Sequence, residues 1–93
     1  MIQTRPATLP DITDLHVHFL AILPTIEEYA ELAHRHLVNF HDREDAIAET
    51  IALAWASYYK LARRGRHALA SPTALAHAAV RSVRIGRLTC RTT

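Results

Sequence analysis

The 93-residue chain is poor in the residues that mark several protein classes. Its one cysteine, Cys90, excludes a disulfide-stapled scaffold and fits a reducing compartment. Two glycines and four prolines are too few for the many turns of an all-β protein. No apolar run approaches the roughly 20 residues of a membrane span, and the first residues lack a basic-then-apolar leader pattern. The sequence therefore predicts a small cytoplasmic protein.

Size and composition predict one small helical domain. The chain has a mass of 10.5 kDa, and a chain this short buries only about 60–65% of its unfolded surface, so its core is thin. Hydrophobic residues make up 49% and charged residues 22%, which excludes wholesale disorder. We predict a single domain over residues 1–93, with a core over about 20–87 and frayed ends at 1–10 and 88–93.

Acidic residues are missing from the second half of the chain. Residues 1–49 hold all nine acids and three bases, a formal charge of −6, whereas residues 50–93 hold eight bases and no acid. A basic half of this kind is typical of a protein that contacts a polyanion such as DNA. A helix with a solvated basic face would give the same count.

Hydrophobic periodicity predicts three helices. One covers residues 42–64, with Asp42 as N-cap and Gly65 as a left-handed stop. Another covers about 20–38, with Pro24 in its first turn, and the last runs from Ser71 to Gly86 after a loop over 66–70. The connection between the helices predicted over 20–38 and 42–64 is short, so we expect these two helices to run antiparallel. The fold class is all-α, either a small three-helix bundle or an open helical array.

The same periodicity assigns core faces. The predicted core stripe of the 42–64 helix is Ile47, Ile51, Ala54, Trp55, Tyr58, Leu61 and Ala62. That of the last helix is Leu75, Ala78, Ala79 and Val83, with Val80 at its edge. Trp55 is therefore expected to be buried, and Asp45, Glu49 and Leu53 to point outward.

Seven histidines require a test for metal binding. The string from Asp14 to His18, Asp-x-His-x-His, resembles the first metal-binding strand of metal-dependent amidohydrolases, in which residues two apart share a face. That fold needs a barrel of around 250 residues to supply the remaining ligands, and no later strand pattern is present. Cys90 falls in the tail that is predicted to fray, where nothing orders a base beside it, and Ser57, Ser71 and Ser82 are explained by helix surfaces and a helix cap. We expect no metal, no cofactor, no catalytic residue and no enzyme activity.

The stretch from Asp42 to Trp55, DREDAIAETIALAW, resembles the second conserved region of bacterial RNA polymerase sigma factors. In that family an acidic-aliphatic string leads into Leu-x-Trp. Residues 29–37 resemble the helix before this motif, and residues 75–87 occupy the place of the basic DNA-reading helix, so the resemblance covers about residues 24–87.

The resemblance implies a non-enzymatic role in transcription. Asp45, Glu49 and Leu53 would dock on the clamp coiled coil of RNA polymerase. Arg81, Arg84 and Arg87 would contact DNA, mainly its backbone.

The chain also departs from the family. Ala48 stands where the family usually carries glutamine, and no aromatic residue follows Tyr59 to stack on unpaired bases. The alternative prediction is therefore a small helical protein-interaction module without promoter-opening activity.

Overall fold

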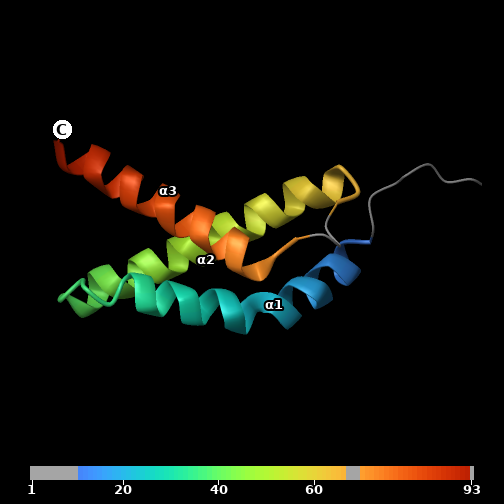
Figure 1. The fold of residues 1–93 in the computed structure, drawn as a ribbon, viewed down its shortest axis with the longest axis horizontal. Coiled ribbons are helices and arrows are strands. Elements are labelled where there is room, and N and C mark those ends of the chain that lie inside the picture. The colour runs from blue at the N-terminus through green and yellow to red at the C-terminus, as the bar shows by residue number, and fades with distance from the viewer. Residues whose placement is uncertain (1–10, 67–69, 93) are drawn as a thin grey trace, which may run out of the picture.

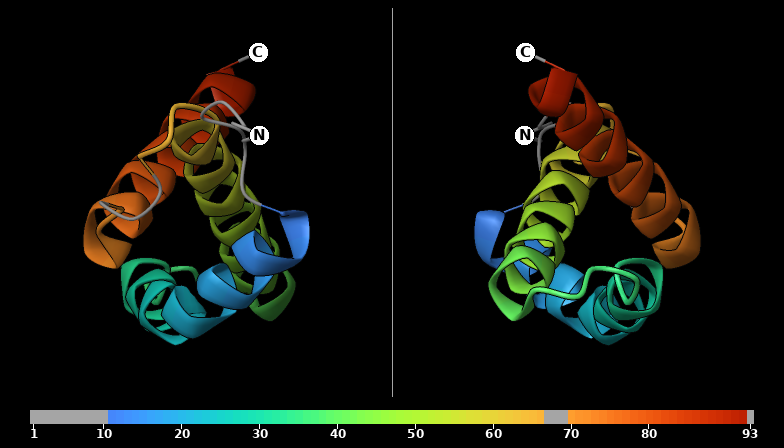
Figure 2. Two further views of the ribbon diagram at one scale, coloured as in Figure 1. Left: turned by 90° about the vertical axis from the view of Figure 1, so that its right-hand side faces the viewer. Right: turned by 90° about the vertical axis from the view of Figure 1, so that its left-hand side faces the viewer.

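Three helices account for nearly all of the described chain. The structure, a computed structural model, describes the backbone of residues 11–66 and 70–92 and the side chains of residues 11–66 and 70–86. The helices are α1 (Ile12–Ala33), α2 (Phe40–Arg63) and α3 (Pro72–Thr92). α1 and α2 run antiparallel, and α3 crosses both, so each helix packs against the other two (Figure 1, Figure 2). The predicted all-α three-helix bundle is confirmed.

The prediction for α1 is wrong at both ends. α1 begins at Ile12, eight residues before the predicted start, and ends at Ala33. Pro24 therefore lies inside the helix, where it has no N–H to donate to the carbonyl of Leu20. Leu20 and Pro24 are both exposed, so the missing hydrogen bond lies at the solvent-facing side of α1. The N-terminal turns of α1 are not collinear with its C-terminal turns (Figure 2), as expected of a helix with an internal proline.

The ends of α2 are set by one side chain and one glycine. Asn39 is the N-cap, and its Oδ1 accepts a hydrogen bond of 3.1 Å from the Asp42 amide, so Asp42 lies in the first turn and is not the cap as predicted. Gly65 has a φ of +71°, which confirms it as the left-handed stop. The Arg66 amide then donates to Leu61 O at 2.8 Å, and the Gly65 amide to Ala62 O at 2.9 Å.

α3 starts where it was predicted to start and ends later. Ser71 Oγ accepts a 3.2 Å hydrogen bond from the Ala74 amide, which confirms the N-cap with Pro72 in the first turn. Gly86 does not end the helix, which continues to Thr92, so residues 88–92 are helical where fraying was predicted. The predicted frayed segment 1–10 and residues 67–69 of the predicted loop lie outside the described residues.

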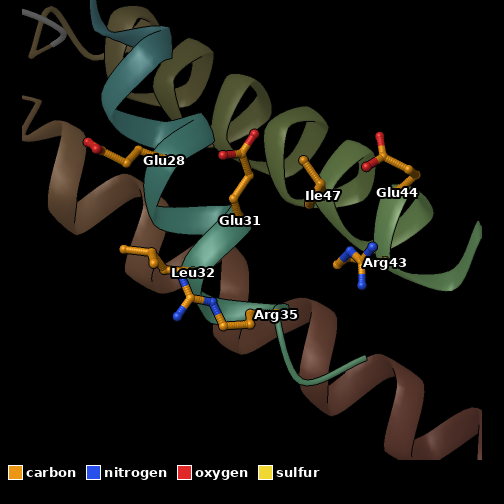
Figure 3. Close-up of a pocket in the computed structure, with 7 residues that line it drawn as sticks. All are labelled: Glu28, Glu31, Leu32, Arg35, Arg43, Glu44 and Ile47. Carbon is orange, nitrogen blue, oxygen red and sulfur yellow. The ribbon is translucent and has the colours of Figure 1, made fainter. Parts of the chain in front are cut away.

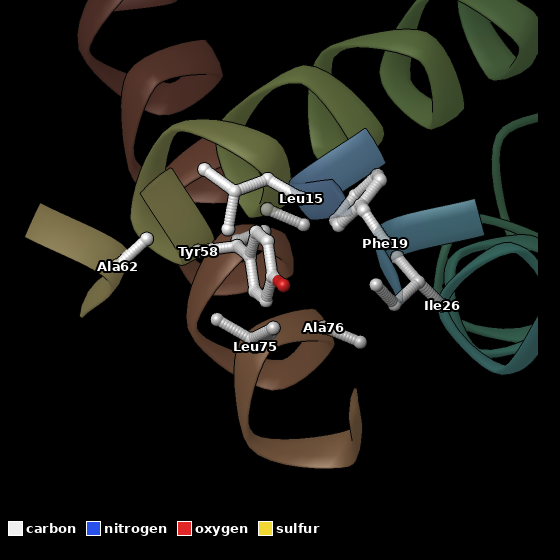
Figure 4. Close-up of a cluster of buried hydrophobic side chains, with 9 residues drawn as sticks. Leu15, Phe19, Ile26, Tyr58, Ala62, Leu75 and Ala76 are labelled. Carbon is white, nitrogen blue, oxygen red and sulfur yellow. The ribbon is translucent and has the colours of Figure 1, made fainter. Parts of the chain in front are cut away.

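The core is centred on Tyr58 of α2, surrounded by Leu15 and Phe19 of α1 and by Leu75 of α3 (Figure 4). The buried residues of α2 are spaced by four: Ala46, Thr50, Ala54, Tyr58 and Ala62. Small residues at four of these five positions let the neighbouring helices approach α2 closely.

This spacing corrects the predicted core face of α2. Trp55 is half-buried at the flank, together with Ile47 and Ile51, and was wrongly predicted to be central. On α3, Ala78 was predicted to lie in the core stripe and is exposed, whereas Ala76, which was not part of that stripe, is buried. Val80, predicted at the edge, is buried as well. Among the described residues, no helix combines the length and the apolar character needed to cross a membrane.

Candidate functional surfaces

Asp45, Glu49 and Leu53 form an exposed strip along α2, which we call the acidic strip. The three residues are spaced by four, and Leu53 is 39% exposed. All three are exposed, so their predicted outward position is confirmed. The wrong placement of Trp55 does not affect this result, because the three residues lie away from the observed buried row of α2 and also away from the predicted core stripe. An exposed leucine beside two carboxylates offers a partner one apolar anchor and two charges.

The three arginines predicted to contact DNA differ in their surroundings. Arg81 and Arg84 are exposed, one turn apart on α3, whereas the side chain of Arg87 lies outside the described residues. Arg84 Nη2 donates a 2.8 Å hydrogen bond to Ala33 O, the last carbonyl of α1. α1 has no basic residue in its last turn, so Arg84 supplies the positive charge that favours this helix end. Arg84 therefore has a structural role that its sequence position did not reveal.

A groove of about 610 Å³ runs between α1 and α3, and we call it the α1–α3 groove. It is lined by Tyr29, Leu32, Ala33, His77, Val80, Arg81 and Arg84. The rings of Tyr29 and His77 meet edge to face with their centroids 6.3 Å apart. No sequence pattern revealed this groove, because its two sides are about 50 residues apart and no local pattern connects them.

A second groove, between α1 and α2, carries charges of both signs. Glu28, Glu31, Leu32 and Arg35 of α1 face Arg43, Glu44 and Ile47 of α2 (Figure 3). Arg43 Nη1 donates to Leu37 O at 2.8 Å, and its guanidinium lies 5.7 Å from the centre of the Phe40 ring. Arg43 therefore stabilises the connection between α1 and α2, which is a structural role for this residue on the α2 side of the groove.

The histidines of the Asp-x-His-x-His string lie on a helix, not on a strand. His16 stacks against Trp55, with ring centroids 4.9 Å apart, and His18 Nδ1 lies 2.5 Å from the Tyr58 hydroxyl. These contacts pack α1 against α2. Among the described residues, no three metal-ligating side chains come close enough together to hold an ion.

Burial raises the pKa of the Tyr58 phenol above its ordinary value of 10.0, because a tyrosinate charge would have to leave water. Below that value both the folded and the unfolded chain keep the proton. As the pH rises further, the unfolded chain loses its proton first, so the free energy of unfolding falls through this window.

We therefore expect alkaline destabilisation that depends on Tyr58. Urea unfolding of the unmodified protein should show a steeper loss of stability between about pH 9 and pH 11 than that of Tyr58→Phe, which cannot ionise there. Equal losses in the two proteins would assign the alkaline transition to other groups.

The geometry thus presents two exposed surfaces of opposite charge, the acidic strip of α2 and the α1–α3 groove, on a scaffold in which His16 and His18 pack α1 against α2. Comparison of the chain with family models, with curated proteins and with solved structures finds no match.

Proposed function

We propose that the protein is a sigma-factor-like transcription protein that docks on bacterial RNA polymerase through the acidic strip and contacts DNA through α3. The observation that carries this proposal is the exposure of Asp45, Glu49 and Leu53 on one face of α2. The sequence resemblance assigns docking to the same three residues.

Docking can be tested with a double substitution. Glu49→Lys with Leu53→Ala reverses one charge and removes the apolar anchor, so binding to core RNA polymerase should weaken by about thirtyfold, the equivalent of about 2 kcal/mol. Binding to immobilised polymerase by biolayer interferometry measures this, and circular dichroism should be unchanged because both residues are exposed.

The matched control lies on α1. Glu27→Lys with Leu20→Ala makes the same chemical changes at two other exposed positions and should leave binding unaltered. If both double variants bind as well as the unmodified chain, the acidic strip is not the docking surface.

DNA contact can be tested at Arg81. Arg81→Ala should weaken binding to duplex DNA and lower the salt dependence of log K by about 0.9 in slope, the value for one lost phosphate contact. Arg63→Ala, which removes an exposed cation in the last turn of α2, is the control. Arg84→Ala is a poor probe because it also breaks the bond to Ala33. Fluorescence anisotropy at several salt concentrations would refute the assignment if Arg81→Ala kept the full slope.

A second candidate function is a helical protein-interaction module without promoter-opening activity. It is favoured by the bond from Arg84 to Ala33 O, which engages one of the three arginines within the fold. The lack of aromatic residues after Tyr59 favours it too, because base capture uses stacking rings. Polymerase binding without any DNA binding at low salt would select this candidate.

A further inference from the structure

The acidic strip and the α1–α3 groove are complementary in charge and in apolar character. The groove has Leu32, which is 57% exposed, at its α1 side and buried Val80 beneath it. Arg81 and Arg84 line its α3 side. The strip ends in Leu53, one turn from Glu49 and two turns from Asp45. Each surface therefore has an exposed leucine, and the lining of the groove holds two arginines and no acid, opposite in charge to the strip.

Dimensions also fit. From Asp45 to Leu53 the strip rises about 12 Å along α2, at about 1.5 Å per residue. The groove side chains span about one turn of α1, from Tyr29 to Ala33, and about two turns of α3, from His77 to Arg84. A single helix face of two turns therefore matches the length of the α3 side of the groove.

One copy of the chain cannot satisfy its own groove. Asp45 and Leu53 of the strip are exposed, as are Leu32 and Arg81 of the groove, so the two surfaces do not cover each other within the molecule. The charge split points in the same direction, because the acidic half of one chain attracts the basic half of another.

We propose that the protein associates with itself head to tail, with the acidic strip of one copy seated in the α1–α3 groove of the next. Leu53 packs against Leu32 and Val80, and the carboxylates of the strip face Arg81 and Arg84. The contact is heterologous, so each added copy leaves one strip and one groove open, and assembly continues beyond a dimer. This inference does not rest on polymerase docking, although self-association would cover the same strip.

Sedimentation equilibrium over a range of protein concentrations tests the proposal. The average mass should start at the 10.5 kDa of the monomer, rise with concentration and pass the mass of a dimer. In about 1 M salt, where the screening length falls to about 3 Å, it should return toward the monomer. A constant monomer mass at low salt would overturn the proposal and would leave the groove to another acidic partner.

A charge swap identifies the surfaces. Asp45→Lys alone and Arg81→Glu alone should each be monomeric, because each spoils one side of the contact. Mixing the two variants should restore association, since the first keeps an intact groove and the second keeps an intact strip. If the copies associated through any other surface, mixing these two variants would not be expected to restore association.

The matched controls change the net charge equally at other exposed positions. Glu27→Lys has the charge of Asp45→Lys, and Lys60→Glu has that of Arg81→Glu. Both controls should assemble like the unmodified chain. Association that survives either site variant alone, or that is lost equally in the controls, would refute the assigned contact while leaving polymerase docking to its own assay.

Discussion

Replacing Tyr58 by alanine should lower the free energy of unfolding by about 3–5 kcal/mol, a large part of the total of about 5–14 kcal/mol for a chain of this length. Tyr58 is fully buried and, among the side chains that the structure describes, is the largest that is fully buried. Its ring contacts those of Phe19 and Trp55 at centroid distances of 5.6 and 5.9 Å, so truncation leaves a cavity between all three helices.

The comparison with Trp55→Ala makes this prediction discriminating. Trp55 is the larger side chain, but it is half-buried, so its truncation should cost less, about 1.5–3 kcal/mol. Urea unfolding followed by circular dichroism gives both values. If Trp55→Ala is the more damaging change, the core face of α2 is centred on Trp55 and not on the row that contains Tyr58.

Replacing Thr50 by valine should destabilise the protein by about 1–3 kcal/mol through the loss of one buried hydroxyl. His34 is 1% exposed, and its Nε2 lies 2.9 Å from Thr50 Oγ1. The Thr50 hydroxyl proton is already donated to Ala46 O at 2.8 Å, so His34 must be the donor to Thr50. Valine keeps the shape of threonine but leaves the Nε2–H of His34 without this acceptor.

Thr50→Ser is the control for this effect. Serine retains the hydroxyl and loses only one methyl group, so its cost should be close to that of a small cavity, about 1 kcal/mol. Thermal unfolding of the two variants separates the explanations. A smaller loss in Thr50→Val than in Thr50→Ser would show that packing of the methyl group matters more than the hydrogen bond to His34.

The fold could be predicted where local chemistry decides it. The left-handed stop at Gly65 follows from the conformational freedom of glycine. The start of α3 at Ser71-Pro72 follows from helix capping, and the exposure of the acidic strip follows from helical spacing. α1 could not be placed in this way, because Pro24 is normally a helix start and is tolerated here only at the solvent-facing side of a packed helix.

The error in α2 has a different origin. Large apolar residues such as Trp55 and Ile51 suggested the core face, but the helices approach most closely over the alanines and Thr50. Which of two neighbouring stripes is central depends on how near the other helices come, and a single sequence carries no direct record of that distance. The α1–α3 groove was missed for the same reason, since it exists only after packing.

The hydrogen bond from Arg84 to Ala33 O joins α3 to the end of α1 through two residues that are 51 positions apart. Because of this bond, ligand binding at Arg84 is coupled to order at the end of α1. A phosphate or carboxylate that binds the Arg84 guanidinium competes with that carbonyl. The free energy that such an anion gains from Arg84 is reduced by what the end of α1 loses, and by reciprocity a looser α1 end binds the anion more tightly. Amide exchange in residues 30–37 would then report on occupancy of the basic surface of α3, even though those amides do not belong to it.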